Sequence, residues 1–243
     1  MDSAKFSAIG HGQMRYWNPI HADVFQQWMN ELNLKSSRRA LDVGCGRAEL
    51  LRQLADRFAC QCIGVDTSAA ATEMAAGLEA IDVRCTPFQA ADFGAEYFNL
   101  IACIGSTHAV GDLETTLQIL GQLLVADGEM WLGIGYWQRP PEQGYLDFLQ
   151  CDASEMMDHA GNLQNFARAG WDVVGHHLTT AAEWSEYEDG YAENLYRYIA
   201  AHPEDPDTAA IKKRIDGWRS AYLQWGHNTM GFGVYRLRQK LQN

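Results

Sequence analysis

ALDVGCGRAEL, residues 40–50, is the stretch of sequence that decides the fold of this chain. A short apolar run enters a tight Gly-x-Gly turn at Gly44 and Gly46, and a segment with helical periodicity leaves it. Glycine lets the backbone adopt positive φ and lets a ligand approach closely. Strand, glycine turn and helix in this order predict a nucleotide-type ligand site at the end of a strand.

Alternating strands and helices surround this turn. Strands are predicted at residues 39–43, 61–65, 82–86, 98–104, 129–134, 171–178 and 230–237, and helices at 48–58, 68–80, 113–125 and 162–169. Strands separated by helices of this length imply a parallel sheet with right-handed crossovers. The ligand crevice of such a sheet lies at the carboxyl ends of its strands.

Helical additions flank this core. Apolar side chains within residues 11–34 recur at three- and four-residue steps, which predicts an amphipathic helix that begins at Asn18-Pro19. Two aromatic-rich helical segments within residues 181–226, separated by HPEDP at 202–206, break the alternation. The predicted fold is α/β, a Rossmann-like, doubly wound, mostly parallel seven-stranded sheet with an N-terminal helix and a helical insertion before the last strand.

We expect these parts to form one domain. Its predicted segments are an N-terminal helical segment at 1–37, a cofactor-binding core at 38–180, a helical cap at 181–228 and a closing strand at 229–243.

The composition limits the partners of the chain. Its 243 residues are 47% hydrophobic, and 19 Lys and Arg against 31 Asp and Glu give a net charge of −12. Such a surface repels a phosphate backbone, so nucleic acid is not expected as a partner. No apolar stretch is long enough to span a membrane, and Met1–Gly10 does not resemble a secretory signal. We therefore expect no membrane insertion and a cytoplasmic location.

No metal site is expected. The six cysteines follow no metal-ligand spacing, and buried, reduced thiols are the better explanation for them. His176 and His177 are consecutive on a predicted strand, so their side chains face opposite sides.

Acidic side chains stand beside the glycine turn and after the next strand. Asp42, just before the turn, suits a cationic amino-acid head group. Asp66 ends the second predicted strand, where a carboxylate can accept hydrogen bonds from both hydroxyls of a ribose. A dinucleotide turn normally has a third glycine where this chain has Glu49, which would repel a pyrophosphate. An NAD(P)-dependent oxidoreductase is therefore the weaker alternative.

Four segments carry a resemblance to the class I S-adenosylmethionine-dependent methyltransferases: LDVGCGRAELL at 41–51, GVDTS at 64–68, FNLIACIGSTHAVG at 98–111 and GEMWLGIGYW at 128–137. Within that superfamily the chain looks most similar to bacterial small-molecule enzymes of the ubiquinone/menaquinone-methyltransferase type. The resemblance covers residues 12–180, and GHNTMGFGVYRLR at 226–238 is similar to the closing strand of those enzymes.

The resemblance implies S-adenosylmethionine as the cofactor and assigns residues to its parts. The methionine part would lie at the turn, the ribose after the second strand, the adenine after the third strand and the sulfonium after the fourth. The matching residues are, in that order, Asp42, Gly44, Cys45 and Gly46; Asp66, Thr67 and Ser68; Gln89 and the backbone N–H of Ala90; and Ile104 and Gly105. The family usually has Asp at the adenine position, where this chain has Gln89, or else the acid has shifted to Asp92.

His108 is the candidate catalytic residue because it follows the fourth strand at the crevice rim. Imidazole, with an ordinary pKa of about 6.5, can act as a base at neutral pH. The alternative is a polar loop residue that bonds a backbone carbonyl. Amino- and nucleobase-methylating relatives carry an Asn/Asp-Pro-Pro-aromatic motif here, and residues 105–108 read GSTH instead. Methyl transfer chiefly needs proximity and alignment, so a base is not obligatory.

Aromatic side chains are candidates for the acceptor pocket. Tyr136 and Trp137 end the fifth strand, and Trp184 and Tyr187 share one helix face. These rings either line the pocket or pack in the core. N-terminal residues His11, Arg15, Tyr16 and Trp17 either close over the cofactor or pack on the sheet.

The predicted function is methyl transfer from S-adenosylmethionine to a small organic acceptor, apolar or aromatic. A non-catalytic S-adenosylmethionine-binding protein is the second alternative.

Overall fold

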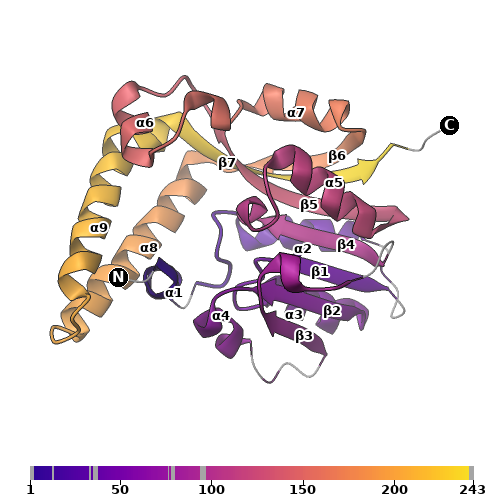
Figure 1. The fold of residues 1–243 in the computed structure, drawn as a ribbon, viewed down its shortest axis with the longest axis horizontal. Helices are drawn as coiled ribbons and strands as arrows, with labels where there is room; N and C mark the ends of the chain where they lie inside the picture. Colours follow the sequence, from indigo (N-terminus) through magenta and orange to yellow (C-terminus); the bar gives the residue numbers. More distant parts are fainter. Residues whose placement is uncertain are drawn as a thin grey trace.

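The computed structural model describes residues 3–12, 14–32, 34, 38–75, 77, 80–93 and 97–240. Its central sheet has the strand order β3-β2-β1-β4-β5-β7-β6 (Figure 1). The strands are β1 Arg39–Val43, β2 Gln61–Asp66, β3 Ile81–Cys85, β4 Phe98–Ile104, β5 Leu124–Trp137, β6 Trp171–Leu178 and β7 Met230–Gln239. β1 to β5 pair in parallel, and β7 pairs antiparallel with β5 and β6. The predicted Rossmann-like, mostly parallel seven-stranded sheet is confirmed.

Helices cover both faces of this sheet and one of its ends. Their bounds are α1 Ser3–His11, α2 Ala22–Glu31, α3 Glu49–Phe58, α4 Ala69–Met74, α5 Leu113–Leu123, α6 Gln143–Leu149, α7 His159–Arg168, α8 Ala181–Ala201, α9 Thr208–Ala221 and α10 His227–Thr229. α8 and α9 form the predicted insertion between β6 and β7. Figure 1 shows them side by side beyond one end of the sheet, with α1 against α8. None of the helices described is long and apolar enough to cross a membrane.

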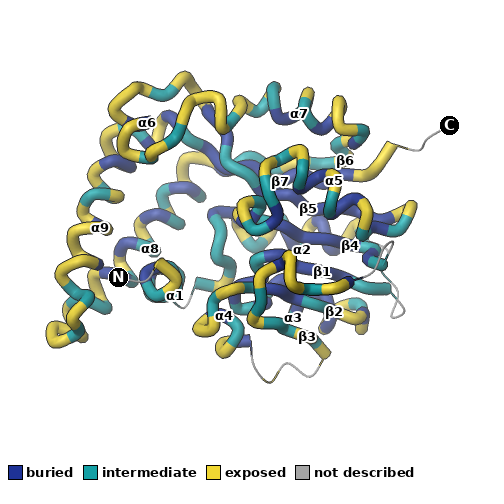
Figure 2. The backbone as a smooth tube through the Cα atoms, viewed as in Figure 1, coloured by how far each residue is buried: buried dark blue, intermediate teal, exposed yellow. Residues whose placement is uncertain are grey.

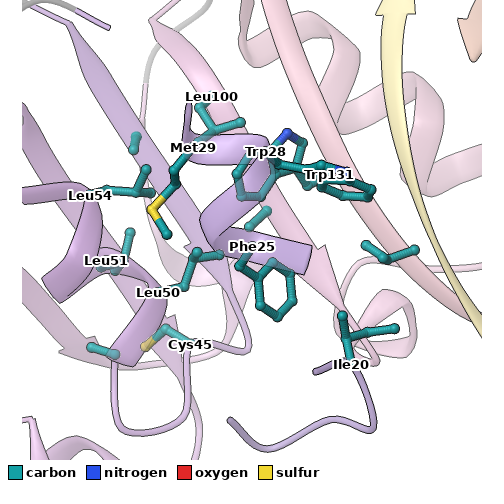
Figure 3. Close-up of a cluster of buried hydrophobic side chains, with 14 of the residues drawn as sticks. Ile20, Phe25, Trp28, Met29, Cys45, Leu50, Leu51, Leu54, Leu100 and Trp131 are labelled. Carbon is teal, nitrogen blue, oxygen red and sulfur yellow. The ribbon is translucent and has the colours of Figure 1, made fainter. Parts of the chain in front are cut away.

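Two layers of buried side chains sandwich the sheet, which explains why its strands are nearly continuously apolar. On one face, Phe25 and Met29 of α2 and Leu51 of α3 pack with Trp131 of β5 (Figure 3). On the other face, the cluster holds side chains of α5 and α7, including Phe166, against the strands. Figure 2 shows the central strands buried and the outer turns of the helices exposed.

The predicted start of the N-terminal helix at Asn18-Pro19 is wrong. α2 begins at Ala22, and the Nδ1 atom of His21 accepts a hydrogen bond from Asp23 N–H. Asn18 instead accepts a hydrogen bond from Ile20 N–H at 3.0 Å, which holds a turn before the helix. The residues ahead of α2 therefore form an irregular segment with bends, called here the strap, residues 14–21.

α1 was not predicted, and it belongs with the cap. Phe6 is buried among Leu195 of α8 and Ile211 of α9. Lys5 forms an ion pair with Asp205, in the loop between α8 and α9, at 2.8 Å. The strap therefore runs from a helix anchored on the cap to a helix anchored on the sheet.

Candidate functional site

The glycine turn after β1 is held on both sides. Gly44 and Gly46 have φ of +73° and +51°, in the left-handed region that favours glycine. A Cβ atom on Gly44 would overlap Ser106, whose hydroxyl donates to the carbonyl of Val43. A Cβ atom on Gly46 would lie 3.3 Å from the ring of Trp17. The turn is thus packed between the loop after β4 and the strap.

Asp66 fastens the end of β2 to this turn. One carboxylate oxygen accepts a hydrogen bond from Gly46 N–H at 2.9 Å, and the other accepts from Ser68 N–H at 2.8 Å. Each carboxylate oxygen has a second lone pair, so ligand hydroxyls can still be accepted. Ser68 caps α4, and Thr67 is exposed beside it. The predicted ribose residues therefore lie next to the glycine turn.

Asp42 is a buried carboxylate without a partner. Asp42 is only 6% exposed. Its side chain forms no hydrogen bond or ion pair with the residues described. Burial, and then the nearby Asp66 carboxylate, raise the pKa of Asp42 to about 8. A buried charge is costly unless a donor or cation compensates it. This position therefore favours a ligand that brings a positive charge.

A cavity of about 40 Å³ lies between the turn and the strap. Among its lining residues are four of the predicted cofactor residues: Asp42, Gly44, Cys45 and Ile104. The strap contributes Arg15, Tyr16, Trp17 and Asn18 to the wall. The N-terminal segment thus lies over the predicted cofactor loop.

Polar contacts hold the strap in this place. Arg15 pairs with Glu49, in the first turn of α3, at 2.7 Å, and Arg52 pairs with the same carboxylate at 2.9 Å. Burial raises the pKa of Glu49, but hydrogen bonds from Arg52 and Arg15 outweigh it and keep the pKa below its usual value. An ionised carboxylate therefore occupies the helix start where a dinucleotide pyrophosphate would bind.

His11, at the end of α1, joins the strap to the cap. Its ring stacks on Trp17 with the centroids 4.7 Å apart, and its Nε2 atom is 2.9 Å from the hydroxyl of Tyr187 on α8. Burial lowers the pKa of His11 to about 4, so the ring is neutral at neutral pH. Sequence reasoning did not identify this link, because it depends on the packing of α1 against α8.

A second cavity, of about 280 Å³, lies between the strap and the first turns of α8. It shares Arg15, Tyr16 and Asn18 with the first cavity, and Tyr187 lines its cap side. Tyr187 is one of the predicted acceptor residues.

The other predicted acceptor residues line neither cavity. Trp184 is buried in the core cluster beside Phe232, and its indole N–H has no partner among the residues described. Tyr136 packs against Gly231, and Trp137 donates its indole N–H to the carbonyl of Ala153 at 2.9 Å. All three rings are buried.

Residues after β3 and β4 lie on exposed turns. Gln89 donates from Nε2 to the carbonyl of Ala109 at 2.5 Å, which leaves its side-chain oxygen as an acceptor. The backbone N–H of Ala90 already donates to Pro87 at 3.0 Å, so its predicted bond to the adenine is not supported. His108 is exposed, and Gly105 has φ of +75°; neither lines either of the two cavities described above.

A glycine turn after β1, an acidic residue after β2 and an antiparallel seventh strand define the methyltransferase class of Rossmann-like folds. Residues 16–132 match the model of a family described as a methyltransferase domain. The match confirms the methyltransferase that the sequence predicts.

Similarity to individual proteins extends over the whole chain. An uncharacterized protein of Escherichia coli, YjhP, is 26% identical over 98% of this chain and 99% of its own. A crystal structure of an S-adenosylmethionine-dependent methyltransferase from Geobacter sulfurreducens, in complex with S-adenosylhomocysteine, has a TM-score of 0.87 at 22% identity, with 97% and 98% of the two chains covered. Its counterpart from Thiobacillus denitrificans has a TM-score of 0.86 at 23% identity, with 99% and 100% covered. The fold of these proteins therefore includes the cap and the N-terminal helix.

Proposed function

We propose that this protein binds S-adenosylmethionine at the glycine turn and transfers its methyl group to a small organic acceptor, apolar or aromatic. The observation that carries the proposal is the buried Asp42, which has no partner among the residues described and lies beside a turn of positive φ. The ammonium of an amino-acid head group would supply a cation to pair with this carboxylate. The similar structures from two bacteria contain S-adenosylhomocysteine, the product of such a transfer.

In this proposal each part of the cofactor has its own residues. Those residues are Asp42, Gly44, Cys45 and Gly46 for the methionine part; Asp66, Thr67 and Ser68 for the ribose; the side chain of Gln89 for the adenine; and Ile104 and Gly105 for the sulfonium side. S-Adenosylmethionine supplies a methyl group on a sulfonium, a leaving group that needs no acid. The protein then chiefly has to align the acceptor with that methyl group.

The acceptor would enter the second cavity, beyond the strap. Met14, Pro19 and Ile20 give this cavity apolar walls, and Tyr187 adds a ring, which suits an apolar or aromatic molecule. His108 remains a proposed base that acts only if the acceptor reaches the rim beside β4. Kinship with the ubiquinone/menaquinone-methyltransferase type is likewise a proposal, and it rests on the sequence segments at 41–51 and 98–111.

The test is turnover with a metabolite pool. The protein is incubated with S-adenosylmethionine and fractions of a cell extract, and S-adenosylhomocysteine is quantified while mass spectrometry searches for a metabolite that has gained one methyl group. We expect product only where protein and one active fraction are combined. Tight binding of S-adenosylhomocysteine with no turnover in any fraction would favour the non-catalytic alternative.

A further inference from the structure

A histidine and a tyrosine meet where α1 packs against α8 (Figure 1). The Nε2 atom of His11, the last residue of α1, lies 2.9 Å from the hydroxyl of Tyr187 on α8. Asn194, further along α8, donates from Nδ2 to the carbonyl of Gly10 at 3.0 Å and holds the end of α1 in place. Tyr187 also lines the cavity of about 280 Å³. The pair therefore lies at the wall of the cavity proposed for the acceptor.

The hydrogen bonds of His11 determine which of its nitrogens carries the proton. Nδ1 lies 2.9 Å from the carbonyl oxygen of Ser7 and 3.2 Å from the hydroxyl of the same residue. A carbonyl oxygen can only accept, so Nδ1 has to carry the hydrogen. Burial lowers the pKa of His11 to about 4, so the ring is neutral and Nε2 keeps its lone pair. The hydroxyl of Tyr187 therefore donates to Nε2.

This direction of the bond leaves the oxygen of Tyr187 able to accept. Its hydrogen is bound to His11, and the oxygen accepts no hydrogen bond from the residues described. Burial raises the pKa of Tyr187 above its usual value, so the hydroxyl stays protonated. A phenol can accept as well as donate, so a hydroxyl that donates to a neutral imidazole can also accept from a ligand. Such a hydroxyl forms the middle of a proton relay.

We infer that Tyr187 is a catalytic residue that takes the proton from a hydroxyl group of the acceptor while passing its own proton to Nε2 of His11. The inference rests on the proposed function and narrows the acceptor to a molecule that carries a hydroxyl group. As the acceptor oxygen bonds to the methyl carbon, the carbon–sulfur bond breaks and its electron pair goes to sulfur. The positive charge of the sulfonium then ends on the imidazole of His11, which releases the proton to solvent.

The weakness of His11 as a base limits the acceptors that it can serve. An oxygen that gains a methyl group while it keeps its proton becomes an oxonium, a far stronger acid than an imidazolium with a pKa of about 4. His11 can therefore receive the proton while the new bond forms, although it is too weak to ionise a free hydroxyl beforehand. The ring of Trp17, stacked on His11 with the centroids 4.7 Å apart, stabilises the resulting cation. A neutral amine attacks without a base, so the relay indicates a hydroxyl acceptor.

Two other candidate bases are less suited to this cavity. His108 lines neither of the two cavities described above. Glu183 lines the second cavity, but its carboxylate already accepts from Thr180 N–H at 2.7 Å and contacts Nε2 of His177 at 2.9 Å. Tyr187 differs from both because it lines the cavity and has a base bonded behind it.

The tautomer of His11 tests the relay without any acceptor. Nitrogen-15 NMR of the full-length protein, labelled at histidine, distinguishes a protonated from an unprotonated imidazole nitrogen. We expect a protonated Nδ1 and an unprotonated Nε2 in the ligand-free protein, and a change mainly at Nε2 in Tyr187→Phe. His11→Gln removes the signals of this ring and so assigns them among the eight histidines. A proton on Nε2 would overturn the inference, because Tyr187 would then accept from His11.

Turnover with the active extract fraction tests whether the proton follows this route. We expect Tyr187→Phe to lower kcat about 10²–10⁴-fold and to change the acceptor's KM and the affinity for S-adenosylhomocysteine less than about threefold. His11→Gln can accept the hydroxyl of Tyr187 through its amide oxygen but cannot take a proton, so it should show a similar loss.

Tyr191→Phe is the matched control, because it removes the same hydroxyl from the same helix. Tyr191 lines neither of the two cavities, and its hydroxyl forms no hydrogen bond with the residues described. Its kcat should equal that of the wild type.

Three results would overturn the inference. Full kcat in Tyr187→Phe or in His11→Gln would exclude the relay, and a product methylated on nitrogen would exclude the hydroxyl acceptor. A loss of turnover in Glu186→Gln but not in Tyr187→Phe would make the exposed Glu186 the base of this cavity. A protein that neither binds S-adenosylhomocysteine nor turns over with any fraction would refute the proposed function itself, and the catalytic role of Tyr187 would fall with it.

Discussion

Replacing Asp42 with Asn tests whether a buried charge is kept for a cationic ligand. The pKa of Asp42 is raised to about 8, so the folded protein holds this proton more tightly than the unfolded chain does. The destabilisation from this carboxylate is therefore absent below the ordinary pKa of Asp and grows as the pH rises toward 8. At about 1.4 kcal/mol per pKa unit, its upper limit is about 6 kcal/mol.

We expect a smaller effect, of about 1–3 kcal/mol, which is the range for buried polar groups without partners. Urea unfolding of the ligand-free protein at about pH 5 and about pH 9 measures it. Asp42→Asn should be the more stable protein at the higher pH, and its advantage should shrink at the lower pH. The same variant should bind S-adenosylhomocysteine at least about tenfold more weakly.

Asp172→Asn is the matched control, because Asp172 is exposed on β6 and should change neither quantity. If Asp42→Asn has the same stability difference from wild type at both pH values, the carboxylate is not the unpartnered charge described above. If it binds S-adenosylhomocysteine as tightly as wild type, Asp42 does not hold the ammonium.

Five further substitutions probe the rest of the site. Asp66→Ala should weaken S-adenosylhomocysteine at least about tenfold by titration and lower the melting temperature, since it also frees Gly46 N–H; unchanged affinity in a folded variant would exclude the ribose role. Gly46→Val should abolish binding, because φ of +51° disfavours a β-branched residue, and retained affinity would contradict the loop assignment. His108→Asn should lower turnover about 10²–10⁴-fold if it is the base and only a few-fold if alignment suffices, with cofactor affinity unchanged in both cases. Tyr187→Ala should raise the acceptor's KM, whereas Trp184→Ala should lower the melting temperature without that change; the reverse pattern would place the acceptor elsewhere.

The sheet and the glycine turn could be predicted from the sequence because local signals agree with the fold there. β1 is buried from Ala40 to Val43 and apolar at three of these four positions, so residues 39–43 indicate a central parallel strand. The turn needs positive φ at Gly44 and Gly46, and the sequence supplies glycine at both. Asp66 could be predicted as part of the same site because it is the last residue of the neighbouring strand, β2.

Features set by distant packing could not be predicted in this way. α1 owes its place to contacts of Phe6 with the cap, some 190 residues farther along the chain. The apolar spacing within residues 11–34 predicted a helix from Asn18-Pro19, but Ile20 lies in the strap and is buried there.

Acceptor residues were hardest to predict because burial and binding favour the same side chains. Trp137 and Trp184 have the apolar area of a pocket wall, and both are buried in hydrophobic clusters. Tyr187 differs from these two rings because it lines the second cavity, between the strap and α8.

The most direct test of the central claim is a calorimetric comparison of S-adenosylhomocysteine with NADH on the same preparation. Both ligands offer a ribose to Asp66, but only S-adenosylhomocysteine brings an ammonium to Asp42, and only NADH brings a pyrophosphate toward the ionised Glu49. We predict one molecule of S-adenosylhomocysteine bound per chain and no measurable binding of NADH. Saturable binding of NADH with none of S-adenosylhomocysteine would contradict the account and restore the oxidoreductase alternative.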